Sequence, residues 1–273
     1  MNYQIFKIPP NEYDTIEQLG TKEKFWFYDK NDKTTKLFKI GRQGTGENWA
    51  EKVTGELAKL LDLPCAEYEF ATWNRKEGVI SPLFVPQDGR LVHGNEILIQ
   101  IIKNYPKNKF YKVREHKLST VLAVIRAVPD LPRGFERNTI IQKPLEVFVG
   151  YLMFDCWIAN PDRHHENWGL VLDSTNNKIH LAPTYDHASG LGCRVSDDER
   201  VKRLATTDTR YNVEAFVKKV KSAFYDKNLA QLEIIKAFVN AAKQNRKAAY
   251  FWLDKLESIS QIEIENIFGK VPN

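Results

Sequence analysis

The feature that most constrains the fold is a short predicted hairpin with polar residues at both of its ends. Residues 145–159 carry apolar side chains at the i, i+3, i+4, i+7 spacing of a helix. A polar run, NPDRHHEN (160–167), follows directly, and two apolar runs, 168–172 and 179–182, then flank a polar turn. The sequence PTYDH (183–187) comes next. We therefore expect a helix, a polar loop, a β-hairpin and a second polar loop in direct succession.

Oxygen-bearing side chains bracket this hairpin. Asp162 and Asn167 precede it, and Asp186 follows nineteen positions after Asn167. Carboxylate and amide oxygens are the ligands that Mg²⁺ prefers. The spacing is also that of protein-kinase catalytic loops, where the first Asp accepts a hydroxyl proton and the other two side chains hold Mg²⁺. The alternative is that Asp162 and Asn167 only cap turns.

Histidines near the hairpin leave a zinc site as another interpretation. Four of the six histidines and one cysteine lie here, namely His164, His165, His180, His187 and Cys193. Their spacings match neither CxxC nor HExxH. The sequence therefore favours magnesium over zinc.

The remaining segments predict strands first and helices later. Two strands around a polar turn are expected over 25–40, a helix over 47–61, and two further strands over 66–85. Helices are expected over 115–128 and from Val213 onward. The clearest apolar stripe in that last part is Val213, Phe216, Val217, Val220 and Phe224. This segregation indicates an α+β fold with a small sheet-rich lobe and a larger helical lobe.

Composition excludes several classes of protein. With 273 residues, 42% hydrophobic and 27% charged, the chain is neither disordered nor fibrous. The net charge is +5 and the basic residues are scattered, which argues against direct nucleic-acid binding and suits a phosphate-bearing ligand. No run is long and apolar enough for a membrane span, and the three cysteines imply no disulfide framework. We expect a soluble cytoplasmic protein, and translocation as an effector stays open.

The two polar loops resemble the catalytic core of the HipA-like kinases, a family of bacterial toxin–antitoxin Ser/Thr kinases. NPDRHHENWGLVL followed by LAPTYDHASGL is similar to the family pattern D-R-H-x-x-N-x-G, short hairpin, L-A-P-x-Y/F-D. The resemblance covers about residues 15–190 and implies a two-lobed, protein-kinase-like fold in a compact form without the family's N-terminal subdomain. The implied division is an N-lobe over 1–85, an interlobe linker over 86–95 and a helical C-lobe over 96–273.

Segments upstream extend the resemblance. Residues 20–24 resemble the family's short phosphate loop, residues 37–40 the strand with the ATP-contacting lysine, and residues 49–51 the start of the next helix. Residues 82–84 fall where the interlobe linker contacts adenine. The nucleotide-binding residues that the resemblance implies are Gly20, Thr21, Lys22, Glu23, Lys24, Lys39, Glu51, Pro82, Leu83, Phe84, His164 and Tyr185.

The implied activity is ATP- and Mg²⁺-dependent transfer of the γ-phosphate to a Ser/Thr hydroxyl of a protein. Asp162 would be the catalytic carboxylate, and Asn167 and Asp186 the metal ligands. The implied partners are ATP, the protein substrate and a small antitoxin or regulator protein. Two alternatives stay open: a lipid or small-molecule kinase on the same fold, and a catalytically silent pseudokinase that binds a partner.

Thr21 is a candidate autophosphorylation site, because relatives often carry a hydroxyl residue in this loop whose phosphorylation shuts the site. A group of about −1.5 to −2 charge at Thr21 would compete with ATP phosphates for Lys24 and Lys39. We expect intact-mass analysis and peptide mapping after incubation with Mg-ATP to find phosphate on Thr21. An active preparation without it would show that Thr21 only favours the turn.

Overall fold

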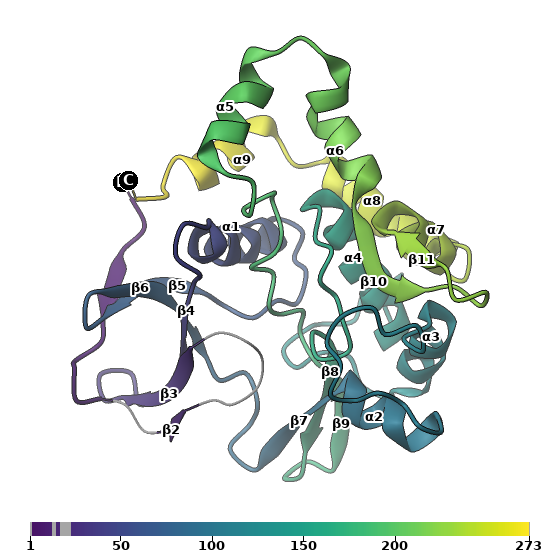
Figure 1. Ribbon diagram of the computed structural model, residues 1–273. Helices are drawn as coiled ribbons and strands as arrows, with labels where there is room; N and C mark the ends of the chain where they lie inside the picture. The colour runs from purple at the N-terminus through teal and green to yellow at the C-terminus, as the bar shows by residue number, and fades with distance from the viewer. Residues whose placement is uncertain (1, 13–14, 17–22, 273) are drawn as a thin grey trace.

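The computed structural model describes residues 2–12, 15–16 and 23–272, which form two lobes (Figure 1). Within this part of the chain, the N-terminal lobe is a six-stranded sheet with the order β1-β5-β6-β4-β3-β2. Its strands are β1 (Ile5–Lys7), β2 (Thr15–Ile16), β3 (Lys24–Asp29), β4 (Thr34–Ile40), β5 (Glu69–Trp73) and β6 (Lys76–Pro82). All neighbours are antiparallel except β1 and β5. Helix α1 (Glu47–Leu60) packs against β5 and β6.

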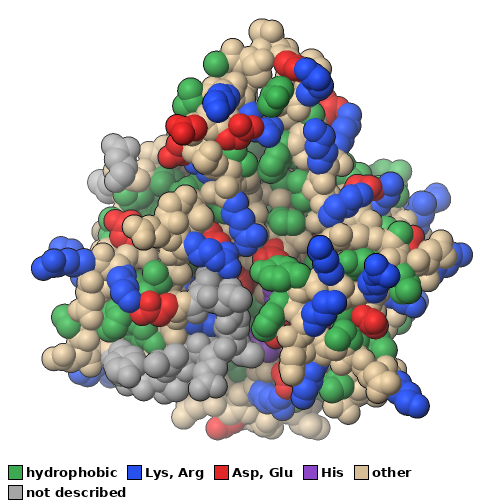
Figure 2. All heavy atoms as spheres, viewed as in Figure 1, with side chains coloured by type: hydrophobic (Ala, Val, Ile, Leu, Met, Phe, Trp, Pro, Cys, Tyr) green, Lys and Arg blue, Asp and Glu red, His purple; other side chains and the backbone are tan. Residues whose placement is uncertain are grey.

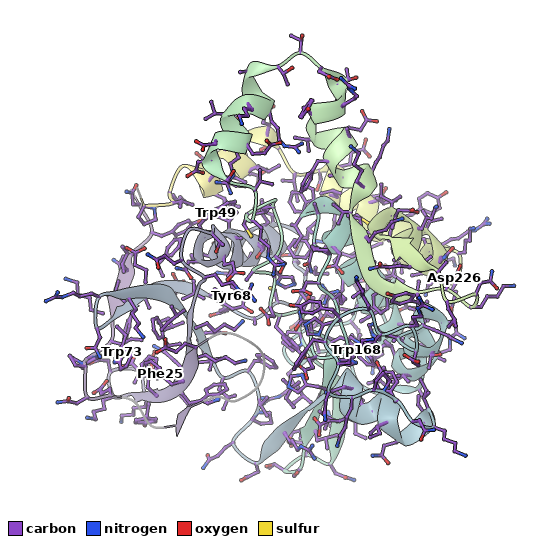
Figure 3. The ribbon with its side chains drawn as sticks, in the orientation of Figure 1. Phe25, Trp49, Tyr68, Trp73, Trp168 and Asp226 are labelled. Atoms are coloured by element: carbon purple, nitrogen blue, oxygen red, sulfur yellow. The ribbon has the colours of Figure 1, made fainter. Side chains whose placement is uncertain are left out.

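The β3–β4 hairpin, predicted over residues 25–40, is confirmed. Phe25 and Phe38 pair across it and are buried on one face of the sheet, where Phe25 also lies 4.8 Å from Trp73 between ring centroids (Figure 3). Side chains alternate between the two faces of a strand. Lys39 therefore projects from the opposite face to Phe38, the face that borders the second lobe.

The C-terminal lobe is built mainly of helices. They are α2 (Gly94–Ile101), α3 (Leu118–Ala127), α4 (Pro144–Trp157), α5 (Asp197–Ala205), the 3₁₀-helix η1 (Thr209–Tyr211), α6 (Val213–Lys219), α7 (Ile234–Ala242), α8 (Arg246–Glu257) and α9 (Gln261–Phe268). Two small antiparallel sheets accompany them: β7 (Gly89–His93), β8 (Gly169–Asp173) and β9 (Lys178–Leu181), and β10 (Lys221–Tyr225) with β11 (Gln231–Glu233). In the described part of the chain, no helix combines the length and the apolar character needed to cross a membrane.

Helix α4 is buried on every side, whereas its spacing predicted a single apolar stripe. All side chains from 147 to 155 are buried, because α3, α7 and α8 pack around this helix. Gly150 allows α8 to pack closely against α4, because a Cβ atom at position 150 would lie 2.5 Å from the Trp252 side chain. The indole of Trp252 donates a hydrogen bond to the carbonyl of Glu146 at 2.8 Å. The loop after α4 therefore starts from a fixed position inside the core.

The apolar stripe from Val213 to Phe224 is not one helix. Helix α6 ends at Lys219, Val220 is extended, and residues 221–225 form β10, which pairs with β11. Apolar side chains at positions 220 and 224 satisfy the spacing of either structure, and the pairing with β11 selects the strand.

The sequence-based description lacks the strands β1, β2, β7, β10 and β11. β1 adds a parallel edge to the N-terminal sheet. β7 lies inside the stretch 86–95 that the sequence predicted as a linker, and it pairs with β8. The hairpin predicted from its two apolar runs is confirmed as β8 and β9, and β7 extends it to three strands.

A buried histidine connects the hairpin to β10. His116 accepts a hydrogen bond from the Trp168 indole at 3.0 Å and donates one from Nδ1 to the carbonyl of Ala223 at 3.1 Å. Its ring stacks on Phe224, with the centroids 4.6 Å apart. Burial lowers the pKa of His116 to about 3, so the imidazole is neutral in the folded protein.

We expect the protein to lose stability as the pH falls below 6.5 and His116→Gln to reduce that loss. Unfolded histidine binds a proton below its ordinary pKa of 6.5, whereas folded His116 does so only near pH 3. The contribution of His116 to the free energy of unfolding is therefore fully present above pH 6.5. Below that pH it falls by up to about 1.4 kcal/mol per pH unit.

Urea unfolding at a series of pH values between these limits measures the slope. A His180→Gln variant, at a part-exposed position on β9, controls for the loss of an imidazole. Parallel stability curves for wild type and His116→Gln would contradict the assignment.

Candidate active site

Most side chains singled out in the sequence line one cavity between the lobes, with a volume of about 540 Å³. The members from that set are Lys24, Lys39, Pro82, Leu83, Phe84, Asp162, His164, Asn167, Tyr185 and Asp186. Glu51 lies behind Lys39, whereas the carboxylate of Glu23 pairs with Lys76 at 2.7 Å and does not line the cavity. Gly20, Thr21 and Lys22 lie outside the described residues.

Lys39 is held at the cavity wall by two carboxylates. Its Nζ lies 3.3 Å from Oδ1 of Asp186 and 3.6 Å from Oε2 of Glu51. Burial opposes the positive charge, but Asp186 and Glu51 outweigh it, and the pKa of Lys39 is raised. The other oxygen of Glu51 accepts a hydrogen bond from the backbone N–H of His187 at 2.9 Å. Lys39 is therefore a fixed cation at neutral pH.

Asp186 sits in a tight turn. Its φ of 58° is in the left-handed region, which Asp tolerates better than most residues. Its backbone N–H donates to the hydroxyl of Tyr68 at 3.0 Å, and the Tyr68 ring lies beneath Lys39 at 5.4 Å. The preceding Tyr185 ring is buried near Phe84, with the centroids 5.8 Å apart. The turn thus places a carboxylate and an aromatic ring along the same cavity.

A buried ion pair holds the polar loop 160–167 against α4. Nε and Nη2 of Arg163 both donate to the carboxylate of Asp155, Nη2 at 2.7 Å. Nη1 donates to the carbonyl of Asn167 at 3.2 Å, and the Asn160 amide adds a bond to Asp155 at 2.8 Å. The planar fork of Arg suits such two-point binding. The Asp155 carboxylate therefore holds the start of the loop, and the guanidinium of Arg163 connects it to the end.

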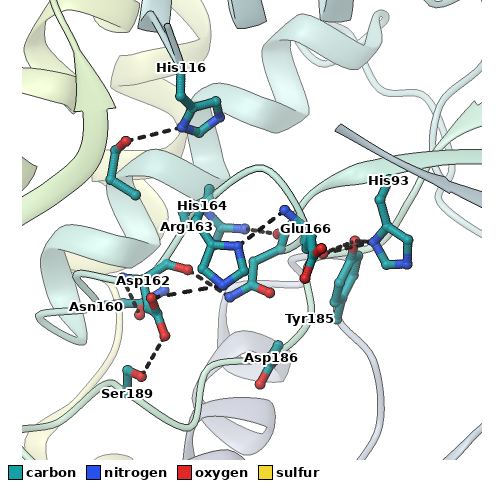
Figure 4. Close-up of polar contacts among 12 residues, drawn as sticks. His93, His116, Asn160, Asp162, Arg163, His164, Glu166, Tyr185, Asp186 and Ser189 are labelled. Carbon is teal, nitrogen blue, oxygen red and sulfur yellow. Dashed lines mark hydrogen bonds and ion pairs between the residues drawn. The ribbon is translucent and has the colours of Figure 1, made fainter. Parts of the chain in front are cut away.

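Asp162 and Asn167 are oriented by different partners (Figure 4). The Asn167 amide nitrogen donates to the carbonyl of Asp162 at 2.6 Å, and its Oδ1 has no hydrogen-bond partner among the described residues. Oδ2 of Asp162 accepts a bond from the Ser189 hydroxyl at 2.9 Å, while Oδ1 lies 4.0 Å from Nε2 of His164. Burial raises the pKa of Asp162, and the hydrogen bond from Ser189 opposes that effect.

His164 adjoins Asp162 as a neutral side chain. Burial lowers its pKa, and its Nδ1 accepts a bond from the backbone N–H of Glu166 at 3.2 Å. Phe110 and Tyr111 lie edge-on to its ring, with centroids 6.4 Å and 6.2 Å away. His164 is thus packed between the polar loop and a neighbouring segment.

Sequence reasoning missed several residues of this cavity. Ser189 binds Asp162, and the guanidinium of Arg194 donates to Ser189 at 2.8 Å and lies 3.9 Å from Asp162. Glu166 also faces the cavity, and burial raises its pKa. Ser189 lies within the segment that carries the family resemblance, three positions after Asp186, and that position was the available signal.

The histidines near the hairpin do not converge on a zinc site. His164 faces the cavity, His165 hydrogen-bonds to Tyr105 at 2.7 Å, and His187 to Thr184 at 2.7 Å. In the described parts of the chain, no three or more His, Cys, Asp and Glu side chains are grouped to hold a metal ion.

Comparisons with known proteins place the chain in a family. Residues 17–246 match the HipA-like C-terminal domain. Among curated proteins, no sequence matches. The crystal structure of the Helicobacter pylori proinflammatory kinase CtkA is similar, with a TM-score of 0.74 and 19% identity over 98% of this chain and 88% of that one. HipA of the Shewanella oneidensis MR-1 toxin–antitoxin complex with HipB and operator DNA gives a TM-score of 0.47 and 14% identity, over 96% of this chain and 65% of that one.

The similarity to CtkA extends over almost the whole of both chains and shows a shared two-lobed kinase fold. The family match includes the sheet-rich lobe from β3 onward, the polar loop, the hairpin and the Asp186 turn. This chain belongs to the HipA-like C-terminal domain family.

Proposed function

We propose that this protein is an ATP- and Mg²⁺-dependent kinase that phosphorylates Ser or Thr hydroxyls of a protein. Family membership and fold support a kinase-type function. One observation supports the proposed use of ATP and Mg²⁺ in particular. Four side chains line one cavity between the lobes, namely Lys39, Asp162, Asn167 and Asp186. Phosphoryl transfer depends mainly on positioning and charge compensation, which these four side chains are arranged to supply. A pseudokinase would have no need of all four.

The apolar part of the cavity suits an adenine ring. Leu37 and Ala66 line it together with the strand end 82–84 and Tyr185. The backbone N–H of Leu83 donates to the carbonyl of Thr35 at 2.9 Å and is therefore already used within the sheet-rich lobe. Lys39, kept charged by its two carboxylates, would bind the phosphates at the polar part.

The donor atoms of Asn167 and Asp186 suit a magnesium ion. The hydrogen bond from the Asn167 nitrogen to the Asp162 carbonyl leaves its Oδ1 for a ligand, and Asp186 adds a carboxylate at the same cavity. Both are the hard oxygen donors that Mg²⁺ prefers. When bound, the ion would neutralise charge on the nucleotide phosphates.

Asp162 would orient the acceptor hydroxyl and take its proton. The Ser189 hydroxyl donates a hydrogen bond to Oδ2 of Asp162, and Arg194 lies close to the same oxygen. Oδ1 therefore remains for an incoming hydroxyl. His164, neutral and 4.0 Å from that oxygen, would limit access of water on one side. In this arrangement Asp162 acts on substrate, and Ser189 and Arg194 hold it in place.

Two further parts of the proposal rest on the sequence and its family resemblance. These are a small regulator protein as partner and the cytoplasm as the place of action.

We expect Asp186→Ala to abolish the dependence of ATP binding on Mg²⁺. The substitution removes a metal donor and the closest carboxylate to Lys39. Calorimetry with a non-hydrolysable ATP analogue, with and without Mg²⁺, measures the effect, and Asp198→Ala on the exposed start of α5 is the control. If Asp186→Ala kept the wild-type response to Mg²⁺, the metal assignment would be wrong.

We expect Asp162→Asn to bind nucleotide normally but to lose about 10²–10⁴-fold in phosphoryl transfer. The amide retains the shape and hydrogen bonding of the side chain but cannot accept the hydroxyl proton as a carboxylate does. Transfer from labelled ATP to a Ser/Thr peptide mixture measures the loss, with Asp198→Asn as the control. Transfer at a near wild-type rate would mean that Asp162 is only a structural cap.

A further inference from the structure

Residues 103–117 form an irregular, strongly basic segment between α2 and α3, called here the basic segment. The segment has one acidic residue, Glu115. The net charge of the segment is +5, which equals the net charge of the whole chain. Its cations are Lys103, Lys107, Lys109, Lys112, Arg114 and Lys117. All of them except the part-buried Lys117 are exposed.

The basic segment is fixed against the polar loop that carries Asp162. The Tyr105 hydroxyl hydrogen-bonds to His165 at 2.7 Å, and the carbonyl of Lys107 accepts a bond from Asn95 at 3.2 Å. Phe110 and Tyr111 line the active-site cavity beside His164. The part of the segment around these two rings, which carries Lys107, Lys109 and Lys112, is therefore held beside the mouth of the cavity, close to the expected position of the acceptor hydroxyl.

These charges have no partners within the described part of the chain. None of the six cations has a carboxylate within 4.0 Å among the described residues. Elsewhere on the cavity wall, by contrast, Arg42 and Arg194 both contact the buried carboxylate of Glu47. Lys and Arg side chains border the central hollow of the face shown in Figure 2. The unpaired charge is thus available to an external anionic partner.

We propose that the basic segment binds an acidic stretch of the protein substrate next to the acceptor Ser or Thr. This rests on the proposed kinase function and names its substrate class. The cations are spread over fifteen residues on both sides of Tyr111, which is 51% exposed. Spaced cations suit the carboxylates of a polypeptide, whereas a phosphorylated lipid head group requires cations that converge on one point. Exposed ion pairs are individually weak and screened by salt, so several must act together.

A binding measurement tests the proposal without requiring turnover. The probes are two fluorescein-labelled peptides with a central Ser, one flanked by Glu and the other by Gln, added with Mg²⁺ and a non-hydrolysable ATP analogue. We compare wild type with a variant that combines Lys107→Glu, Lys109→Glu and Lys112→Glu. The matched control combines Lys227→Glu, Lys243→Glu and Lys247→Glu, at exposed positions outside the cavity.

We expect wild type and control to bind the Glu peptide about tenfold or more tightly than the Gln peptide, and added salt to reduce that preference. The basic-segment variant should lose the preference while its nucleotide affinity and circular dichroism stay unchanged. Equal binding of the two peptides by wild type, or an equal loss in the control variant, would overturn the proposal.

A second arm separates protein from lipid as the anionic partner. Vesicles containing phosphatidylinositol phosphates are added to the peptide complex. Vesicle binding that depends on the basic segment, without any preference for the Glu peptide, would overturn the proposal in favour of a lipid. Failure of the kinase assignment would appear differently, as loss of Mg²⁺-dependent nucleotide binding or of phosphoryl transfer in every assay.

Discussion

The buried ion pair between Arg163 and Asp155 is the contact on which the arrangement of the site depends. Asp155 belongs to α4, which is enclosed by other helices, and Arg163 belongs to the loop that presents Asp162 and Asn167. The same guanidinium binds the carbonyl of Asn167. Removing one partner of a buried ion pair typically costs about 3–5 kcal/mol, because the other charge is left uncompensated. The loop conformation is therefore anchored from inside the core.

The position of the two lobes relative to each other depends on backbone contacts near the second polar loop. Thr184 exchanges hydrogen bonds with the chain after α1, donating to the carbonyl of Pro64 and accepting from the N–H of Ala66. Glu51 of α1 binds the N–H of His187 through one oxygen and Lys39 through the other. Because Asp186 lies between these contacts, its distance to Lys39 follows from them. The ion pair between Lys39 and Asp186, which joins the two lobes, therefore depends on where the backbone places Asp186.

The elements that could be predicted from sequence are those with local patterns. The hairpin β8–β9 and the spacing of Asp162, Asn167 and Asp186 were visible because all of these residues lie within one short stretch. Their assembly around one cavity with Lys39 was expected from the family resemblance, and their chemical roles remain a proposal. Ser189 escaped notice because its hydrogen bond to Asp162 is a tertiary contact with no sequence periodicity.

Other features depended on packing that a sequence pattern does not record. The residues from Val213 to Phe224 fit a helical stripe, but pairing with β11 converts their second half to a strand. The basic residues seemed scattered along the whole chain, yet the segment 103–117 gathers enough of them to equal the net charge. Its importance became apparent only from its contacts with His164 and His165.

The reaction that we propose for this cavity is transfer of phosphate from ATP to Ser or Thr in proteins. Phosphoproteomics of cells that express wild type or Asp162→Asn at equal levels tests it most directly. We expect a set of phosphoserine or phosphothreonine sites that appear only with wild type. Identical phosphosite profiles from the two cell populations, with both proteins folded and binding nucleotide, would contradict it.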